Sequence, residues 1–206
     1  MRTRDYLKVL QEEIHSVIVA TVDEKGLPVT RAIDIMLVDE ESLYFITAKG
    51  KAFYKQLIET KYVAMTGMTA GVDTISKKAV SIRGKVENLG DSKLDLVFEQ
   101  NPYMAKIYPT KESQARLVVF RLYEGQGEYF DLSTKPITRD DFAIGAQQIK
   151  ASGYVITDKC QGCGSCLAKC PQQCIEGGEV YAIHQENCLH CGNCMVVCPF
   201  AAVEKR

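Results

Sequence analysis

The first 159 residues of this 206-residue chain contain no cysteine, whereas all nine cysteines lie between residues 160 and 198. This uneven distribution divides the sequence into two parts of different chemistry, and the length allows one domain of ordinary size and a small second one. The hydrophobic content of 46% is enough for a packed core.

The chain also lacks an excess of charge of either sign and lacks a long apolar run. The formal net charge is −1, so there is no electrostatic reason to expect a nucleic-acid partner. No apolar run has the length that is needed to span a bilayer, and we expect no membrane association. The charged, helix-forming start at residues 1–16 differs from a secretory leader.

The cysteines themselves follow one pattern twice. The spacing C-x2-C-x2-C-x3-C-P is the bacterial iron–sulfur signature, in which the fourth cysteine binds the other cluster. We therefore predict two [4Fe–4S] clusters. The ligands of one are Cys160, Cys163, Cys166 and Cys198, and those of the other are Cys188, Cys191, Cys194 and Cys170. Residues 154–206 resemble a bacterial two-cluster ferredoxin.

Two other uses of these cysteines are less consistent with the spacing. Zinc also binds C-x2-C pairs, but it does not require a third regularly spaced cysteine followed by Cys-Pro. Disulfides would need an oxidising compartment, whereas oxygen-labile clusters and the absence of a visible export signal favour the cytoplasm. Cys174 is outside both runs and is interpreted either as a small buried side chain or as a spare ligand or redox thiol.

The cysteine-free part reads as short strands with a few helices. We expect helices at residues 4–14, 52–60 and 91–100, and strands at residues 15–23, 29–38, 42–48, 62–68 and 79–88. Residues 115–133 are predicted to form two strands joined by a Gly125-Gln126-Gly127 turn. This order predicts an antiparallel β-barrel at residues 1–135, a polar linker at 136–153, and a small α+β ferredoxin-like domain at 154–206.

The stretch TVDEKGLPVTRAIDIMLVDEESLYFITAKGKAFYKQL (residues 21–57), supported by SIRGKVE (residues 81–87), resembles the split-barrel flavin-binding proteins of the pyridoxamine 5′-phosphate oxidase-like superfamily. The resemblance spans residues 1–132. It implies an FMN-binding homodimer in which the barrels pair and the flavin lies at the subunit interface.

Residues 47–51 have the chemistry of a phosphate site. Thr47, Lys49, Gly50 and Lys51 provide a hydroxyl, two ammonium groups and backbone amides at the start of a predicted helix, where the helix dipole favours an anion. The alternative is that Lys49 and Lys51 are ordinary solvated charges at the start of a helix. The resemblance implies that Arg31 on the preceding strand binds the same phosphate, for which a guanidinium is well suited.

The substrate does not follow from the resemblance. The oxidases that give the superfamily its name continue into a C-terminal segment whose basic residues and histidine bind the substrate phosphate, whereas here the residues after 133 lead into the cysteine motifs. Pyridoxamine 5′-phosphate oxidase activity is therefore not expected. The sequence shows no arrangement of residues that would identify a catalytic group.

Two classes of function remain. The first is an oxidoreductase that passes electrons between two [4Fe–4S] clusters and FMN, with a small molecule or a redox protein as the external partner. The second is a non-enzymatic electron carrier or redox sensor, in which the barrel only dimerises the chain.

Overall fold

The computed structural model describes residues 1–149 and 152–206, which divide into two units. The barrel unit consists of residues 1–71, 79–128 and 141–148. The cysteine unit consists of residues 72–78, 129–140, 149 and 152–206. No helix in these described ranges is long and apolar enough to cross a membrane.

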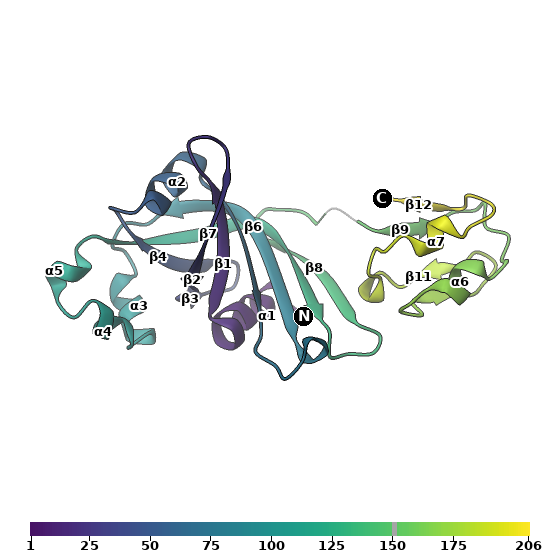
Figure 1. Cartoon of the computed structure of the whole chain (residues 1–206), viewed down its shortest axis with the longest axis horizontal. Coiled ribbons are helices and arrows are strands. Elements are labelled where there is room, and N and C mark those ends of the chain that lie inside the picture. The colour runs from purple at the N-terminus through teal and green to yellow at the C-terminus, as the bar shows by residue number, and fades with distance from the viewer. Residues whose placement is uncertain (150–151) are drawn as a thin grey trace. The chain divides into compact units, whose positions relative to one another are not determined.

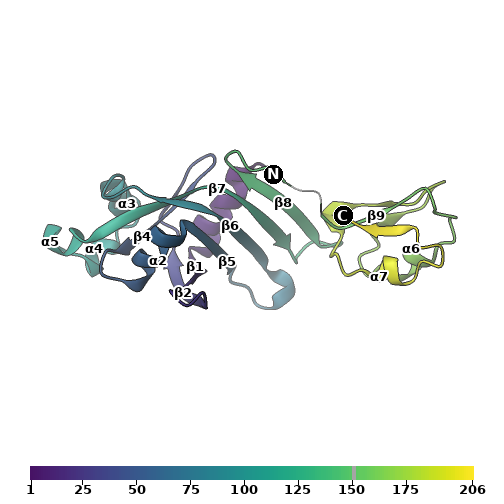
Figure 2. The same cartoon turned by 90° about the horizontal axis from the view of Figure 1, so that it is seen from above.

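The barrel unit is built on a curled, antiparallel sheet (Figure 1). Its eight strands are β1 (Ser16–Val22), β2 (Pro28–Asp34), β3 (Leu37–Val38), β4 (Leu43–Ala48), β5 (Tyr62–Met68), β6 (Lys78–Asn88), β7 (Leu117–Asp131) and β8 (Thr138–Ile144). The strand order is β2-β1-β5-β6-β7-β4-β3, and β8 pairs with β7. Figure 2 shows β5, β6, β7 and β8 side by side. This is the predicted split barrel.

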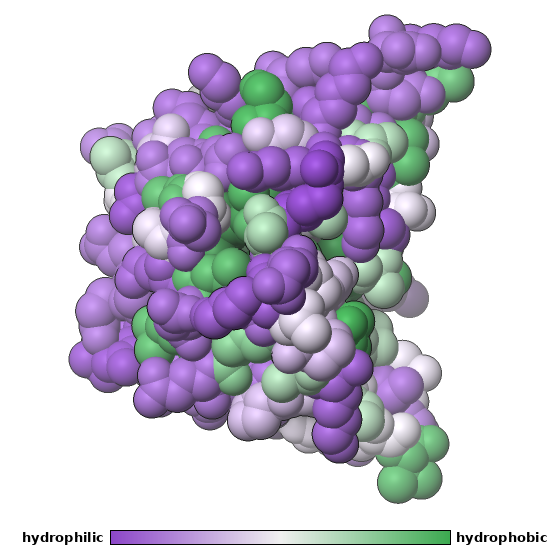
Figure 3. Space-filling model, turned by 90° about the vertical axis from the view of Figure 1, so that its left-hand side faces the viewer, coloured by the Kyte–Doolittle hydropathy of each residue, from purple (hydrophilic) through white to green (hydrophobic). Residues whose placement is uncertain are grey.

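Helices border the sheet at several places. They are α1 (Thr3–Lys8), which continues as a π-helical segment (Val9–Ile14), then α2 (Ala52–Thr60), a 3-10 turn (Thr74–Ser76), α3 (Leu94–Gln100), α4 (Met104–Ile107) and α5 (Lys111–Gln114). The predicted helix at residues 52–60 is confirmed as α2. The face shown in Figure 3 is mostly hydrophilic, with hydrophobic residues in small separate groups.

The barrel has a hydrophobic core between the sheet and the short helices. Strand β4 lacks the usual alternation of buried and exposed side chains, because nearly all of its side chains are buried. One cluster of buried residues comprises Met36, Leu37, Tyr44, Ile46, Val97, Met104, Leu117 and Val119. It joins α3 and α4 to β4 and β7, and burial of this apolar surface is the main favourable contribution to stability.

Two strand predictions were wrong in detail. The predicted strand at 29–38 is divided into β2 and β3, because Ile35 N donates to His15 O at 2.8 Å and Met36 N donates to Tyr44 O at 2.8 Å. The predicted Gly125-Gln126-Gly127 turn lies inside the single 15-residue strand β7. A Cβ on Gly125 would meet the backbone of Gly84, so this glycine permits close approach of strands.

The predicted linker at residues 136–153 contains a strand that the sequence reading missed. Residues Thr138–Ile144 form β8, in which Phe142 and Ile144 are buried. The ring of Phe142 stacks on Tyr6 with a centroid distance of 4.6 Å. These apolar contacts anchor a segment whose first half is polar. Residues 150 and 151 of the predicted linker lie outside the described part of the chain, and the domain boundaries otherwise stay a prediction.

The cysteine unit contains two similar halves. Its elements are β9 (Tyr154–Ile156), α6 (Ser165–Lys169), β10 (Ile175–Glu176), β11 (Ala182–Ile183), a 3-10 turn (Gln185–Asn187), α7 (Asn193–Val196) and β12 (Val203–Lys205). Strand β9 pairs with β12, and β10 pairs with β11, both antiparallel. Each short helix begins at a glycine in the left-handed region, Gly164 at φ 77° and Gly192 at φ 80°, where a side chain would be strained.

Candidate metal centres and cofactor site

The first of two cavities in the cysteine unit is lined by Cys160, Cys163, Cys166 and Cys198. Three of these come from the first C-x2-C-x2-C run, and the fourth comes from the end of the second run. The structure therefore brings together the four cysteines that the sequence assigns to one cluster.

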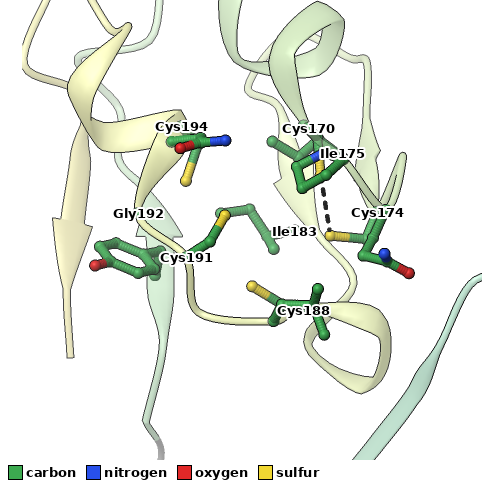
Figure 4. Close-up of a pocket in the computed structure, with 13 residues that line it drawn as sticks. Cys170, Cys174, Ile175, Ile183, Cys188, Cys191, Gly192 and Cys194 are labelled. Carbon is green, nitrogen blue, oxygen red and sulfur yellow. Dashed lines mark hydrogen bonds between the residues drawn. The ribbon is translucent and has the colours of Figure 1, made fainter. Parts of the chain in front are cut away.

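The second cavity is lined by the other predicted set (Figure 4). Its cysteines are Cys188, Cys191 and Cys194 from the second run and Cys170 from the first, together with Cys174. The crossing of the fourth cysteine between the two runs is thus present in the fold. Ligation of iron by these residues stays a prediction.

In the described part of the chain, the thiols at each cavity are not grouped as tightly as the ligands of a single zinc ion would be. Four thiolates on one zinc ion at about 2.3 Å lie within about 4 Å of one another. In the described residues, no three His, Cys, Asp or Glu side chains are grouped closely enough to hold a single metal ion. A cube places each thiolate on a different iron, so a more open arrangement is what it needs.

Backbone amides point at some of these sulfurs. The N–H group of Gly162 lies 3.5 Å from Cys160 Sγ, and that of Ala202 lies 3.3 Å from Cys198 Sγ. Gly162 has a φ of 64°, and His190, at the matching place in the second run, has a φ of 53°. Amide donors of this kind help to set cluster potentials.

The thiols differ in how readily they ionise. The hydroxyl of Ser165 hydrogen-bonds the Cys163 sulfur and lowers the pKa of that thiol, whereas burial raises the pKa of Cys166 and Cys194. A metal deprotonates a coordinating thiol outright. If these buried thiols hold iron, its binding would release their protons at neutral pH.

Cys174, the ninth cysteine, is 4% exposed, and its Sγ lies 3.4 Å from that of Cys170. Figure 4 shows both sulfurs at the same cavity. Burial raises the pKa of the Cys174 thiol, which keeps its proton. Burial also acts to raise the pKa of Cys170, but hydrogen bonds from the backbone and thiol of Cys174 outweigh it and lower that pKa.

In the barrel unit, Arg31 on β2 is held by residues of neighbouring elements. Its Nη1 donates to Thr21 Oγ1 at 2.6 Å, and its Nη2 donates to Gln56 Oε1 at 2.9 Å. The guanidinium lies 4.4 Å from the centroid of the Phe53 ring. Burial lowers the pKa of Arg31. This side chain is fixed in place before any ligand binds.

Thr47 is the last buried residue of strand β4, one position before the strand ends, and its Oγ1 has no hydrogen-bond partner among the described residues. Its side chain is buried, and a buried hydroxyl without a partner is costly. Lys49, Gly50 and Lys51 follow as an exposed turn that leads into α2. The orphaned hydroxyl fits a site whose missing acceptor or donor comes from a bound group.

Two of the backbone amides that were expected to be free for phosphate are already used. Lys49 N donates to Arg116 O at 2.9 Å, and Lys51 N donates to Ala48 O at 3.0 Å. These bonds fix the turn before α2. The contribution of residues 47–51 to an anion site is therefore mainly from side chains, and the assignment stays a prediction.

Sequence reasoning missed Thr21 and Gln56, which orient Arg31. Both side chains are buried, and Thr21 Oγ1 donates to Gln56 Oε1 at 2.6 Å. The available signal was a glutamine on the otherwise apolar face of α2, four residues before Thr60. Nothing in the sequence indicated that β1, β2 and α2 would bring these three side chains together.

Comparison with known proteins matches the two parts of the chain separately. Residues 4–127 match the family described as pyridoxamine 5′-phosphate oxidase. Residues 159–202 match the family described as 4Fe-4S dicluster domain. A pyridoxine/pyridoxamine 5′-phosphate oxidase of Ectopseudomonas mendocina (strain ymp) is 28% identical over 109 residues, which are 53% of this chain and 49% of that protein. The chain thus spans about half the length of this curated relative.

Solved structures show the same barrel fold at low identity. A NimC/NimA family protein from Clostridium acetobutylicum is 18% identical with a TM-score of 0.57, and the match covers 70% of this chain and 95% of that one. A heme binding protein from Mycobacterium smegmatis is 11% identical with a TM-score of 0.54, and the match covers 68% and 57% of the two chains.

Proposed function

The chain belongs to the pyridoxamine 5′-phosphate oxidase family through residues 4–127 and carries a 4Fe-4S dicluster domain at residues 159–202, and from this we propose that it is a flavin- and iron–sulfur-dependent oxidoreductase. The observation that carries the proposal is the pair of cavities, each lined by three cysteines of one run and one of the other. Such clusters exchange single electrons, and a flavin exchanges one or two.

In this proposal the eight cysteines of the two runs hold the clusters in separate cavities. Apolar residues that pack around the two cavities limit the access of water. Ile156, Ile175 and Val203 are buried in the same hydrophobic core as Cys166 and Cys194. Low solvent access and amide hydrogen bonds are the means by which a protein adjusts cluster potentials. Covalent linkage to the barrel raises the local concentration of one redox centre near the other.

FMN is the proposed occupant of the barrel. Arg31, Thr47, Lys49, Gly50 and Lys51 would hold its phosphate. The support is the pre-oriented guanidinium of Arg31 and the unpartnered hydroxyl of Thr47. A fixed guanidinium loses little conformational entropy when it binds a phosphate oxygen.

We also propose a homodimer through the barrel. On β1 and β5 the inward side chains are buried, whereas the outward side chains include the apolar residues Ile18, Val22, Tyr62 and Met68. Ile18 is 50% exposed and Met68 is 49% exposed. The two strands are adjacent, so these side chains share one face. Exposed apolar side chains that share one face of a sheet are typical of a protein interface.

The external partner is proposed to be a small molecule or a redox protein in the cytoplasm. The activity of the curated relative is not carried over, because this chain matches only about half of that protein. The second candidate is an electron carrier or redox sensor in which the barrel dimerises the chain, and the exposed apolar face of β1 and β5 is the observation that favours it.

The test is chemical analysis of protein purified without oxygen. The proposal expects about eight irons and eight sulfides per chain and FMN that is released by acid. Changing Lys49 and Lys51 together to Ala should lower the FMN content several-fold and leave iron unchanged. Iron without releasable flavin would favour the carrier or sensor, and a folded protein without iron would exclude both.

A further inference from the structure

The two halves of the cysteine unit end their ligand runs in equivalent structures. Cys170-Pro171 and Cys198-Pro199 are each followed by two residues and then by a buried one, Cys174 in the first half and Ala202 in the second. The residue before each, Gln173 at φ 52° and Ala201 at φ 48°, adopts the left-handed conformation. The repeat therefore puts a thiol beside one cavity and a methyl group at the matching place beside the other.

The Cys174 thiol is held against a ligand of its own cavity. Its Sγ lies 3.4 Å from Cys170 Sγ, within the range of a hydrogen bond between sulfurs. The carbonyl oxygen of Cys174 accepts a hydrogen bond from His184 N at 2.8 Å, and the next residue begins β10. Because the backbone is fixed on both sides and the side chain is 4% exposed, its S–H group has no access to bulk water.

Resting on the proposed iron–sulfur function, we infer that Cys174 is a positioning residue whose S–H group donates a hydrogen bond to Cys170, and that this bond raises the reduction potential of the cluster in the second cavity. The reason is electrostatic. Reduction adds one electron from an external donor, and the added negative charge spreads over the thiolate ligands. A hydrogen bond to a ligand stabilises the more negative form.

No proton is transferred in this step, because the proton stays on Cys174. The first cavity has the amide of Ala202 near Cys198 but only a methyl side chain at this place. Removal of the Cys174 thiol would therefore affect the cluster of Cys170, Cys188, Cys191 and Cys194 and leave the other cluster unchanged.

The experiment is a reductive titration of the full-length, cluster-loaded protein, followed by electron paramagnetic resonance. Cys174→Ala should lower the reduction potential of the cluster in the second cavity. At a fixed potential, the oxidised-to-reduced ratio of that cluster should shift by about tenfold, which is about 59 mV for one electron. Cys174→Ser keeps a hydrogen-bond donor and should shift this reduction potential less. Ala202→Cys introduces the thiol in the other half and should raise the potential of the other cluster.

Iron and sulfide are measured in every variant. Unchanged potentials in Cys174→Ala, with iron still near the wild-type level, would overturn the inference and leave the proposed function intact. Loss of about half of the iron in Cys174→Ala would also overturn it, because Cys174 would then be a ligand. Absence of iron from the wild-type protein would instead refute the proposed function.

Discussion

Gly84 of β6 and Gly125 of β7 are in backbone contact where the two strands pair. A Cβ atom on Gly84 would lie 2.9 Å from Gly125 Cα, and a Cβ atom on Gly125 would lie 2.9 Å from Gly84 Cα. Each would also meet a carbonyl oxygen of the opposite strand, on Glu124 or Arg83. Neither backbone is able to move without disturbing the central sheet, so the pair fixes how closely β6 and β7 approach.

Replacing Gly125 by Ala should therefore destabilise the barrel by about 3 kcal/mol, at the upper end of the usual cost of overpacking, because the clash is with backbone and not with a flexible side chain. Gly50→Ala is the matched control, since a Cβ there has no atom within 4 Å. The free energy of unfolding in urea, measured without flavin, checks this. Equal stability of the two variants would show that the strands separate easily.

These glycines also show what the sequence does not reveal. Gly125-Gln126-Gly127 reads as a turn, because glycine is common both in turns and where two backbones meet. Here Gly127 lies against the ring of Phe142, and a Cβ atom on Gly127 would clash with that ring. Which of the two uses applies depends on β6 and β8, which are distant in sequence.

The cysteine cavities were predictable because the ligand spacing is local. Each run of three is set by two-residue spacers, and the fourth cysteine is placed by the repeat of the whole pattern. The role of Cys174 was not predictable, because its approach to Cys170 depends on the left-handed conformation of Gln173. The setting of Arg31 was hidden for a similar reason, since Thr21 and Gln56 come from other elements.

The sharing of ligands between runs predicts how paired cysteine substitutions combine. Cys163 and Cys198 line one cavity, and Cys170 lines the other. The double variant Cys163→Ala with Cys198→Ala should keep about four irons per chain, because both changes affect one cluster. Cys163→Ala with Cys170→Ala should lose nearly all iron.

Anaerobic iron and sulfide analysis distinguishes these cases, and circular dichroism checks that both proteins remain folded. If the first pair lost all iron while the second kept half, the fourth cysteine of each run would belong to its own run. The cavities described here would then not be the cluster sites.

The unpartnered hydroxyl of Thr47 predicts opposite effects on stability and on flavin binding. Thr47→Val keeps the shape and removes a buried polar atom without a hydrogen bond. The flavin-free protein should become more stable by about 1 kcal/mol, while its affinity for FMN falls. Thermal unfolding and flavin titration measure the two effects.

Thr21→Val is the matched control, because its hydroxyl is hydrogen-bonded to Gln56 and Arg31. This variant should lower the stability of the flavin-free protein, since it leaves buried partners unsatisfied. A loss of stability in Thr47→Val of the same size would mean that the Thr47 hydroxyl already has a partner in solution.

The hydroxyl of Tyr103 predicts how the stability of the barrel responds to alkaline pH. It donates to Asp34 Oδ2 at 2.6 Å and lies 3.1 Å from His15 Nε2. Burial, followed by the hydrogen bond and the charge of Asp34, raises the pKa of Tyr103 well above its usual value. Above pH 10 the unfolded chain releases this proton while the folded chain keeps it, so stability falls as pH rises.

Tyr103→Phe removes the titrating group and should make the stability curve flatter. Between pH 9 and pH 11, wild type should lose at most about 1 kcal/mol more than the variant, because solvent screens a partly exposed hydroxyl. Urea unfolding at each pH measures the slope. Tyr62→Phe, on the exposed face of β5, is the control and should follow wild type. Parallel curves for wild type and Tyr103→Phe would show that Asp34 does not hold the tyrosine proton.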